Sequence, residues 1–265
     1  HAFIDDEGAE RGFYRGTYLC GACLRPGKQS PGLQGVWVKE NNPAWRADFH
    51  GNINMQALYW GCFTGNRPDL VEPLLAYYLS ILPRCRRDTR DYFQMDGVYL
   101  PHACDIFGNP MGNANVLNLL TSMTPSCWLG SMFWDYFTYT QDRVFLAEIA
   151  YPLLREVTLF TEEYVAIDEE DNVTIAPSIQ WETGSKLNGW GVNSQYDLAA
   201  LRRLWQVTLR AAEILGADPE ERARWQRRLA GIPDFPRDEH SGGWKAFADK
   251  PPGHARGHGP LLTCP

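Results

Sequence analysis

The sequence lacks the long apolar runs, the paired cysteines and the excess of positive charge that mark several protein classes. No run approaches the ~18 apolar residues that a membrane-spanning helix needs, so we expect no membrane span. The net charge of −7 leaves no basic face for phosphate contacts, which argues against a nucleic-acid partner. The seven cysteines are an odd number without a paired spacing, so we interpret them as buried free thiols and not as a disulfide framework.

A signal peptide is also missing, and the chain begins at His1 instead of Met. We therefore expect an amino end that is cut, processed or incomplete, and the compartment cannot be read from it. With 265 residues, the chain is long enough for one large domain with a sizeable core. Nothing in the composition indicates an oligomeric state.

Helical periodicity dominates what is present. Apolar residues recur at helical spacing in about eight segments. The expected helices cover residues 5–24, 54–63, 69–87, 114–123, 127–140, 142–166, 193–215 and 219–230. The first carries an apolar stripe that includes Phe13, Tyr14 and Tyr18, and the last is expected to start with Asp218 as its N-cap, followed by Pro219. The pattern predicts an all-α fold built from antiparallel helix hairpins.

Four segments between these helices are long and rich in Gly, Pro or polar residues: 26–49, 97–113, 172–193 and 231–260. A long loop in a compact domain usually has a function. We therefore expect these four loops to gather at one end of the fold and to carry the site.

Two asparagines, Asn52 and Asn54, flank one isoleucine in the stretch FHGNINMQALYW at residues 49–60. Asn is a poor helix former, so two of them at an expected helix start need a reason. One reason is capping, with Asn52 as the N-cap and Asn54 bonding a nearby backbone amide. The other is a site, since an amide offers one acceptor and two donors without charge.

A loop carboxyl group, Glu182, is a second candidate. It follows Trp181 in PSIQWETG at residues 177–184 and has no basic neighbour until Lys186. An apolar setting raises the pKa of a carboxyl group, as a general acid requires. The alternative for Glu182 is a solvated surface carboxylate.

A histidine and an aspartate stand three residues apart in HACDIFG at residues 102–108. The segment is too broken for a helix, so we expect a loop or a short strand. His102 and Asp105 are either substrate contacts or a hydrogen-bonded pair that locks the loop, and one pair could do both.

These segments follow one another in an order that resembles the catalytic domain of glycoside hydrolase family 95, the inverting α-L-fucosidases. PGLQGVW at residues 31–37, NPAW at 42–45 and HGNINMQALYW at 50–60 resemble the family's PxxLQGxW, NPxW and HxNINxQxxYW. The two later segments resemble its HxTDIWG and PSxSPEN. The resemblance implies an (α/α)6 toroid of antiparallel helix hairpins, incomplete in this chain. Residues 1–265 would then be a partial catalytic domain, without the family's flanking β domains.

The resemblance also implies roles for individual residues. Glu182 matches the general acid, Asn52 and Asn54 match the pair that holds the attacking water, and Asp249 stands where the family has its base. Inversion places such an acid and base roughly 6.5–9.5 Å apart, with the water between them. The implied substrate contacts are His50, Trp45, His102, Asp105, Trp181 and His254.

Two departures bear on the substrate. Leu58 and Phe63 stand where the fucosidases have an Asn and a Glu, and both changes remove polar groups near the expected pocket. The expected substrate is therefore an α-L-fucoside, or a related deoxy- or galacto-type sugar, in an oligosaccharide or glycoconjugate. No cofactor is expected. His254 and His258 have the i, i+4 spacing of a metal pair, but the glycines beside them argue against a helix, so no metal site is expected.

Two other functions stay open at this point. A glycoside phosphorylase on a similar toroid would use phosphate in place of water, and His254, Arg256 and His258 could supply its cationic pocket. A helical scaffold without catalytic activity could bind glycans or partners through its Trp-rich loops.

Overall fold

The computed structural model describes residues 5–111, 122–179 and 190–251. The fold is all-α. Its helices are α1 (Glu7–Cys23), α2 (Asn54–Thr64), α3 (Glu72–Asp88), α5 (Thr124–Thr140), α6 (Arg143–Phe145), α7 (Tyr151–Tyr164), α8 (Gln195–Leu215) and α9 (Pro219–Ala230). The helical turns η2 (Pro68–Val71), η3 (Thr89–Phe93) and η5 (Leu146–Ala150) adjoin these helices, and η1 (Ala44–Ala47) lies in the loop between α1 and α2.

Three short antiparallel strand pairs connect segments of the loops between the helices in the described part of the chain. The first joins β1 (Phe49–His50) to β2 (Ala103–Cys104), with His50 opposite Ala103. The others join β3 (Ala166–Ile167) to β4 (Val173–Thr174), and β5 (Ser178–Ile179) to β6 (Trp190–Gly191). Each ladder therefore holds together two points of the chain that a loop separates.

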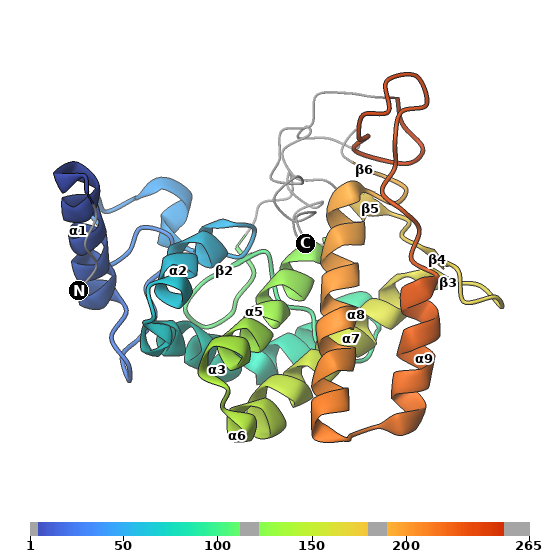
Figure 1. The fold of residues 1–265 in the computed structure, drawn as a ribbon, viewed down its shortest axis with the longest axis horizontal. Helices are drawn as coiled ribbons and strands as arrows, with labels where there is room; N and C mark the ends of the chain where they lie inside the picture. Colours follow the sequence, from blue (N-terminus) through green and yellow to red (C-terminus); the bar gives the residue numbers. More distant parts are fainter. Residues whose placement is uncertain (1–4, 112–121, 180–189, 252–265) are drawn as a thin grey trace.

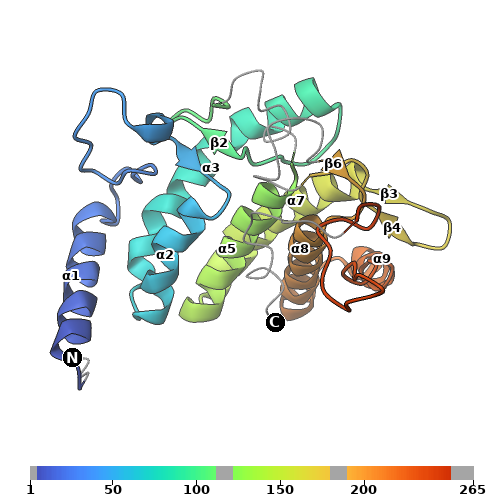
Figure 2. The ribbon, with the colours of Figure 1, turned by 90° about the horizontal axis from the view of Figure 1, so that it is seen from above.

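Figures 1 and 2 show α2, α5 and α8 side by side in this order, with α1 at one edge and α9 at the other. α5 packs against α7 and α8, and α8 packs against α7 and α9. Short connections join α5 to α6 and α7, and α8 to α9, so these packed successive helices form hairpins, as predicted. In Figure 1 most of residues 231–251 lie above the row, at the end where α5 and α8 begin, whereas the loop after α1 first runs downward beside α2.

The core lies between these helices. Its largest fully buried side chains include Tyr59, Phe133, Phe160 and Trp205. Burying a side chain of this size stabilises the fold by roughly 1.5–3 kcal/mol. α8 is the longest described helix and is amphipathic as predicted, because its inner face is buried along most of its length.

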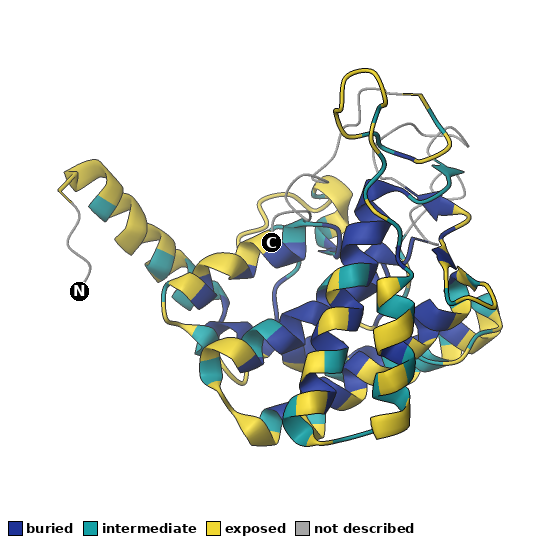
Figure 3. Ribbon diagram, turned by 45° about the vertical axis from the view of Figure 1, so that its right-hand side comes forward, coloured by how far each residue is buried: buried dark blue, intermediate teal, exposed yellow. Residues whose placement is uncertain are grey.

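The first helix forms as predicted, but its apolar stripe is not buried. No residue of α1 is buried, and Tyr18 is 74% exposed. Figure 3 shows α1 reaching away from the rest of the described chain, with exposed residues along most of its length. The helical spacing therefore predicted the helix correctly. No described element packs over its apolar stripe.

Asp218 stands at the N-cap of α9 with Pro219 at the first helical position, as predicted, but it does not cap the helix with its side chain. Its backbone has a φ of 45° and its side chain makes no capping bond. The carboxylate accepts instead from the Tyr151 hydroxyl at 2.5 Å and pairs with Arg155 Nε at 2.9 Å. The carboxylate that was expected to bond the α9 backbone therefore binds two side chains of α7 instead.

None of the described helices combines the length and the apolar content that a bilayer crossing requires.

Candidate active site

The asparagine motif forms a tight turn between β1 and α2. Ile53, the residue between the asparagines, has a φ of 127°, which a β-branched residue rarely adopts. Gln56 caps the helix: its Oε1 accepts from the Ile53 N–H at 2.9 Å, and its Nε2 donates to the Gly51 carbonyl at 2.7 Å. The capping that the sequence offered as a reason for Asn52 is therefore done by Gln56.

Asn52 is buried, with 6% of its surface exposed, and Asn54 is half-buried on the first turn of α2. The carbonyl oxygen Oδ1 of Asn52 has no hydrogen-bond partner among the described residues. A buried polar group without a partner costs roughly 1–3 kcal/mol, so folded proteins have few of them. This oxygen is placed to accept a hydrogen bond from a water or a ligand.

His50 is held between two side chains. Its Nδ1 lies 3.0 Å from Asp48 Oδ1, and its Nε2 lies 3.4 Å from Nε2 of His102. The side chain of Asp48 is 4% exposed and that of His50 is 15% exposed. Because both ring nitrogens face protein groups, a hydrogen bond from His50 to a sugar would require the ring to turn.

Local geometry explains why these groups meet. Alternate residues of an extended segment share a face, which puts Asp48 and His50 on one side. The ladder between β1 and β2 brings His102 alongside, and the Gly51 N–H donates to the His102 carbonyl at 2.6 Å. A Cβ on Gly51 would stand 2.9 Å from Leu129 Cδ1 and 3.3 Å from the His102 carbonyl oxygen, so a larger residue here would have to displace Leu129.

His102 is 1% exposed. Burial, and to a smaller extent the nearby His50, lower the pKa of His102 to about 3, so the ring is neutral near pH 7. The sequence offered a hydrogen-bonded pair of His102 and Asp105, and the structure has a different arrangement. His102 faces His50, and Asp105 closes its own turn by accepting from the backbone N–H of Phe107 and from both nitrogens of Asn109. Burial raises the pKa of Asp105, but the hydrogen bonds from Asn109 and Phe107, together with the charge of Arg84, leave the pKa below its usual range.

Trp181 and Glu182 lie outside the described residues, and the chain on either side of them is joined by the β5–β6 ladder. A fully buried carboxylate, Asp197 on α8, holds this ladder in place. Burial raises the pKa of Asp197, and its hydrogen bonds oppose the rise. The donors are Thr124 Oγ1 at 2.5 Å, Ser178 Oγ at 2.6 Å and the Ile179 N–H at 2.9 Å.

Asp249 is exposed, and its Oδ1 accepts from the Val192 N–H at 2.8 Å. Its segment runs beside the chain that leads into α8, since Ala248 donates to Val192 and Ala246 accepts from Gln195. Asp249 therefore lies just beyond β6. No hydrogen bond joins it to either asparagine in the described part of the chain, and His254 lies outside that part.

Residues 5–250 match the model of the glycosyl hydrolase family 95 catalytic domain. The chain belongs to this family. It is 28% identical over 209 residues to "Alpha-L-fucosidase 2" of Arabidopsis thaliana, covering 77% of this chain and 25% of that protein. It is 30% identical over 159 residues to "Probable alpha-fucosidase A" of Aspergillus niger, covering 59% of this chain and 20% of that protein. The chain thus spans a quarter or less of the length of these curated relatives.

A solved structure supports the toroid fold. "Putative kojibiose phosphorylase from human microbiome" superposes with a TM-score of 0.65, covering 88% of this chain and 35% of that one. The sequence identity of 11% is low, so this likeness speaks for the fold of the family 95 domain and not for its reaction.

Aromatic rings connect the elements around the site of this family 95 domain. Trp60 on α2 and Trp128 on α5 lie 5.8 Å apart between ring centroids, tilted by 40°. Trp128 also packs, with Trp190 of β6, against the buried pair Ile179 and Tyr196. Trp60 is 39% exposed. The rings thus run from α2 across α5 to the ladder that bounds residues 180–189.

Trp45 is 66% exposed on η1, where Trp45, Arg46 and Ala47 all have positive φ. Gln34 Nε2 donates to the Ala44 carbonyl at 3.1 Å and ties this turn to the preceding loop. The turn presents the indole to solvent, where it can stack on a sugar face.

Sequence reasoning missed Asp48, Gln56 and Asp197. Each left a local signal. Asp48 alternates with His50 in an extended segment, and Gln56 stands three residues after the residue that it caps. Asp197 stands three residues after Ser194, whose Oγ accepts from its N–H at 3.1 Å, the spacing of a capping box.

The described part of the family 95 domain contains no cluster of three or more His, Cys, Asp or Glu side chains that could hold a metal ion.

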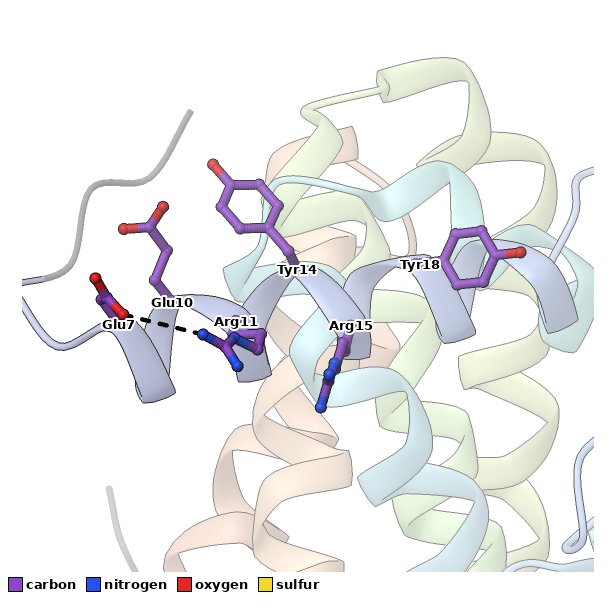
Figure 4. Close-up of a pocket in the computed structure, with 6 residues that line it drawn as sticks. All are labelled: Glu7, Glu10, Arg11, Tyr14, Arg15 and Tyr18. Atoms are coloured by element: carbon purple, nitrogen blue, oxygen red, sulfur yellow. Dashed lines mark ion pairs between the residues drawn. The ribbon is translucent and has the colours of Figure 1, made fainter.

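A hollow along α1 is shown in Figure 4 and is not a candidate site. All its lining residues come from one exposed helix: Glu7, Glu10, Arg11, Tyr14, Arg15 and Tyr18. Arg11 and Glu7 are 3.9 Å apart and largely exposed, and ion pairs of this kind contribute little stability. Among the described residues, no other element lines the hollow.

Proposed function

We propose that this family 95 domain belongs to an inverting, exo-acting glycoside hydrolase whose substrate is an α-L-fucoside or a related deoxy- or galacto-type sugar. Family membership and the names of the curated relatives support this proposal. The observation that carries it is the buried carbonyl of Asn52, which has no hydrogen-bond partner among the described residues.

In the proposed reaction, Asn52 and Asn54 hold the attacking water. Oδ1 of Asn52 accepts a hydrogen bond from one O–H of the water, and the Asn54 amide contributes a second contact. An amide does not titrate near neutrality, so it orients the water without taking its proton. The unusual backbone of Ile53 supports this assignment, since strain of this kind gathers at functional sites.

Glu182 and Asp249 complete the proposed reaction. The water oxygen bonds to the anomeric carbon while the bond from that carbon to the leaving oxygen breaks. Glu182 gives its proton to the leaving oxygen, and Asp249 takes a proton from the water. The product then has the opposite anomeric configuration. Because one group ends deprotonated and the other protonated, a proton exchange with solvent resets the pair.

The position of Asp249 near the start of α8 supports its assignment as the base. Asp249 bonds to Val192, two residues before Ser194, the N-cap of α8. Asp249 therefore lies beside β6, at the end of the ladder that bounds residues 180–189.

The test uses the complete protein that carries this chain and a panel of aryl-glycosides, with the product anomer followed by NMR. We expect release of one sugar with inversion. Glu182→Gln should slow substrates with poor leaving groups most and partly spare those with activated aryl groups, because the latter need less proton assistance. Asn52→Ala should slow both kinds equally.

The same panel separates the alternatives. Product release that requires phosphate would replace the hydrolase with a phosphorylase. Saturable glycan binding without turnover of any aryl-glycoside would favour a binding scaffold. Retention of configuration at the anomeric carbon would overturn the water-holding role of the two asparagines.

A further inference from the structure

A cavity lies at the carboxyl end of α3, separate from the asparagine motif. Its volume of about 610 Å³ lies in the range of roughly 300–1,000 Å³ found for small-molecule sites. None of its lining residues belongs to β1, to the asparagine turn or to α2. The lining residues come from α3, η3 and the loop that follows: Arg84, Cys85, Asp88, Tyr92, Phe93, Tyr99, Pro101, Gly108, Asn109 and Pro110.

Aromatic rings form much of the apolar wall. Tyr99 is buried and stacks obliquely with Phe93, with ring centroids 4.8 Å apart. Tyr92 also lines the cavity, yet it is 70% exposed. A ring that is exposed and borders a cavity offers one face to a ligand at little cost in packing.

The polar wall is held rigid by its own hydrogen bonds. Arg84 Nε donates to Asp88 Oδ2 at 2.9 Å, and Arg84 Nη1 donates to Asn109 Oδ1 at 2.5 Å. Asn109 is fixed in turn by the two oxygens of Asp105. The guanidinium has five N–H donors, of which these bonds use two, and Asp88 Oδ1 is a further acceptor. The remaining N–H donors of Arg84 and the Oδ1 acceptor of Asp88 are therefore neighbours on this wall, and the two side chains form an ion pair.

We propose that this cavity binds a neutral saccharide unit. A sugar hydroxyl both donates and accepts, so neighbouring hydroxyls match a wall with neighbouring donors and acceptors. The C–H face of a pyranose ring can lie on Tyr92. Among the lining residues, the charge of Arg84 is compensated by its ion pair with Asp88, which suits a neutral ligand.

The cavity and the candidate active site lie on the same loop but are distinct. Pro101 lines the cavity, and the next residue, His102, faces His50. The inference does not depend on the proposed hydrolase activity, since a glycan-binding scaffold would carry this site equally well. Occupation of this site would hold a glycan chain near the asparagine turn without using any residue of that turn.

The test is a titration of the full chain, labelled with ¹⁵N, with methyl α-L-fucopyranoside and methyl β-D-galactopyranoside. We expect saturable NMR shifts at the amides of Asp88, Phe93 and Asn109 with at least one of these probes. Tyr92→Ala should weaken this binding about tenfold or more, whereas Tyr92→Phe should retain it. Tyr18→Ala is the matched control, because Tyr18 is 74% exposed on α1 and lines no part of the cavity.

Three outcomes would overturn the proposal. The first is no saturable shift at these amides with either glycoside. The second is equal binding of cyclohexanol, which has the ring but not the neighbouring hydroxyls and would indicate a merely apolar hole. The third is binding that Tyr92→Ala and Arg84→Met leave unchanged. Asn52→Ala should not alter these shifts, so failure here and failure of the proposed hydrolase are distinguishable.

Discussion

His50 and His102 face each other with their Nε2 atoms 3.4 Å apart and their rings nearly perpendicular, at 85°. Asp48 accepts on the other side of His50, at Nδ1. An ionised carboxylate can only accept, so the Nδ1 of His50 carries a proton. A neutral His50 then presents a lone pair at Nε2, and the neutral His102 is the donor across the gap.

The first prediction concerns the proton positions in this chain of groups. In the wild type we expect neutral His50 as the Nδ1–H tautomer and His102 as the Nε2–H tautomer, read from their imidazole ¹⁵N shifts. Asp48→Asn should allow the other tautomer of His50, because an amide can donate to Nδ1 as well as accept from it. Asp69→Asn, at an exposed ion pair with Arg67, should leave both rings unchanged. Finding His50 as the Nε2–H tautomer in the wild type would contradict this arrangement.

The second prediction is a dependence of stability on pH. His102 stays neutral in the folded protein down to about pH 3, whereas an unfolded His takes up a proton near its ordinary pKa of about 6.5. Between these values the unfolded state binds one more proton, so stability rises with pH and is lost as the pH falls. The loss amounts to roughly 1.4 kcal/mol per pH unit within this window.

Urea unfolding between about pH 4.5 and 7 measures this slope. His102→Gln should reduce the slope by one proton, even if the variant is less stable at every pH. His240→Gln, at an exposed position, is the control and should keep the wild-type slope. Identical slopes for the wild type and His102→Gln would show that His102 titrates normally in the fold.

The third prediction separates capping from site function at the start of α2. Gln56→Ala leaves the Ile53 N–H and the Gly51 carbonyl without their partner, so we expect a loss of roughly 1–3 kcal/mol in unfolding free energy. Asn54→Ala should cost less than about 1 kcal/mol, because no cap depends on it. Thermal unfolding gives both values. A larger loss for Asn54→Ala than for Gln56→Ala would return the capping role to the asparagine.

The fourth prediction concerns Asp197. Asp197→Asn replaces one acceptor oxygen by an NH₂ group. In one orientation this NH₂ group faces two donors, the Ser178 hydroxyl and the Ile179 N–H, and in the other it faces the Thr124 hydroxyl. We expect a destabilisation of roughly 1–3 kcal/mol and slower turnover, since the ladder that bounds residues 180–189 is then less well fixed. Asp135→Asn, at a partly exposed pair with Arg203, is the comparison and should cost less. Unfolding and activity measured together test both parts, and unchanged values for both would refute the role of Asp197.

Much of the fold could be predicted because it rests on local spacing. The helix at residues 193–215 was expected from its apolar stripe and is found as Gln195–Leu215 with most of that stripe buried. The start of the helix after Asn52 was expected near residue 54 and is found there. Such patterns depend on neighbours within one or two turns, which the sequence contains in full.

The exposed face of α1 and the carboxylate of Asp218 show the limit of this reasoning. An apolar stripe predicts that a helix can form, but whether another element covers it depends on the whole fold. A capping residue competes with tertiary partners for the same oxygen, and for Asp218 the hydroxyl of Tyr151 and the guanidinium of Arg155 are those partners.

The sequence by itself determined the helical class, the hairpin order and the resemblance to family 95, because amphipathic spacing and motif order are properties of the chain alone. Only the tertiary structure decided which polar groups meet. His102 and His50 are 52 residues apart in sequence, and Asp197 and Thr124 are 73 apart. Their contacts arise where ladders and packed helices bring distant segments together, and burial there sets the direction of each pKa shift. Spacing along the chain carries no information about such distances, since they are fixed by the packing of all the helices at once.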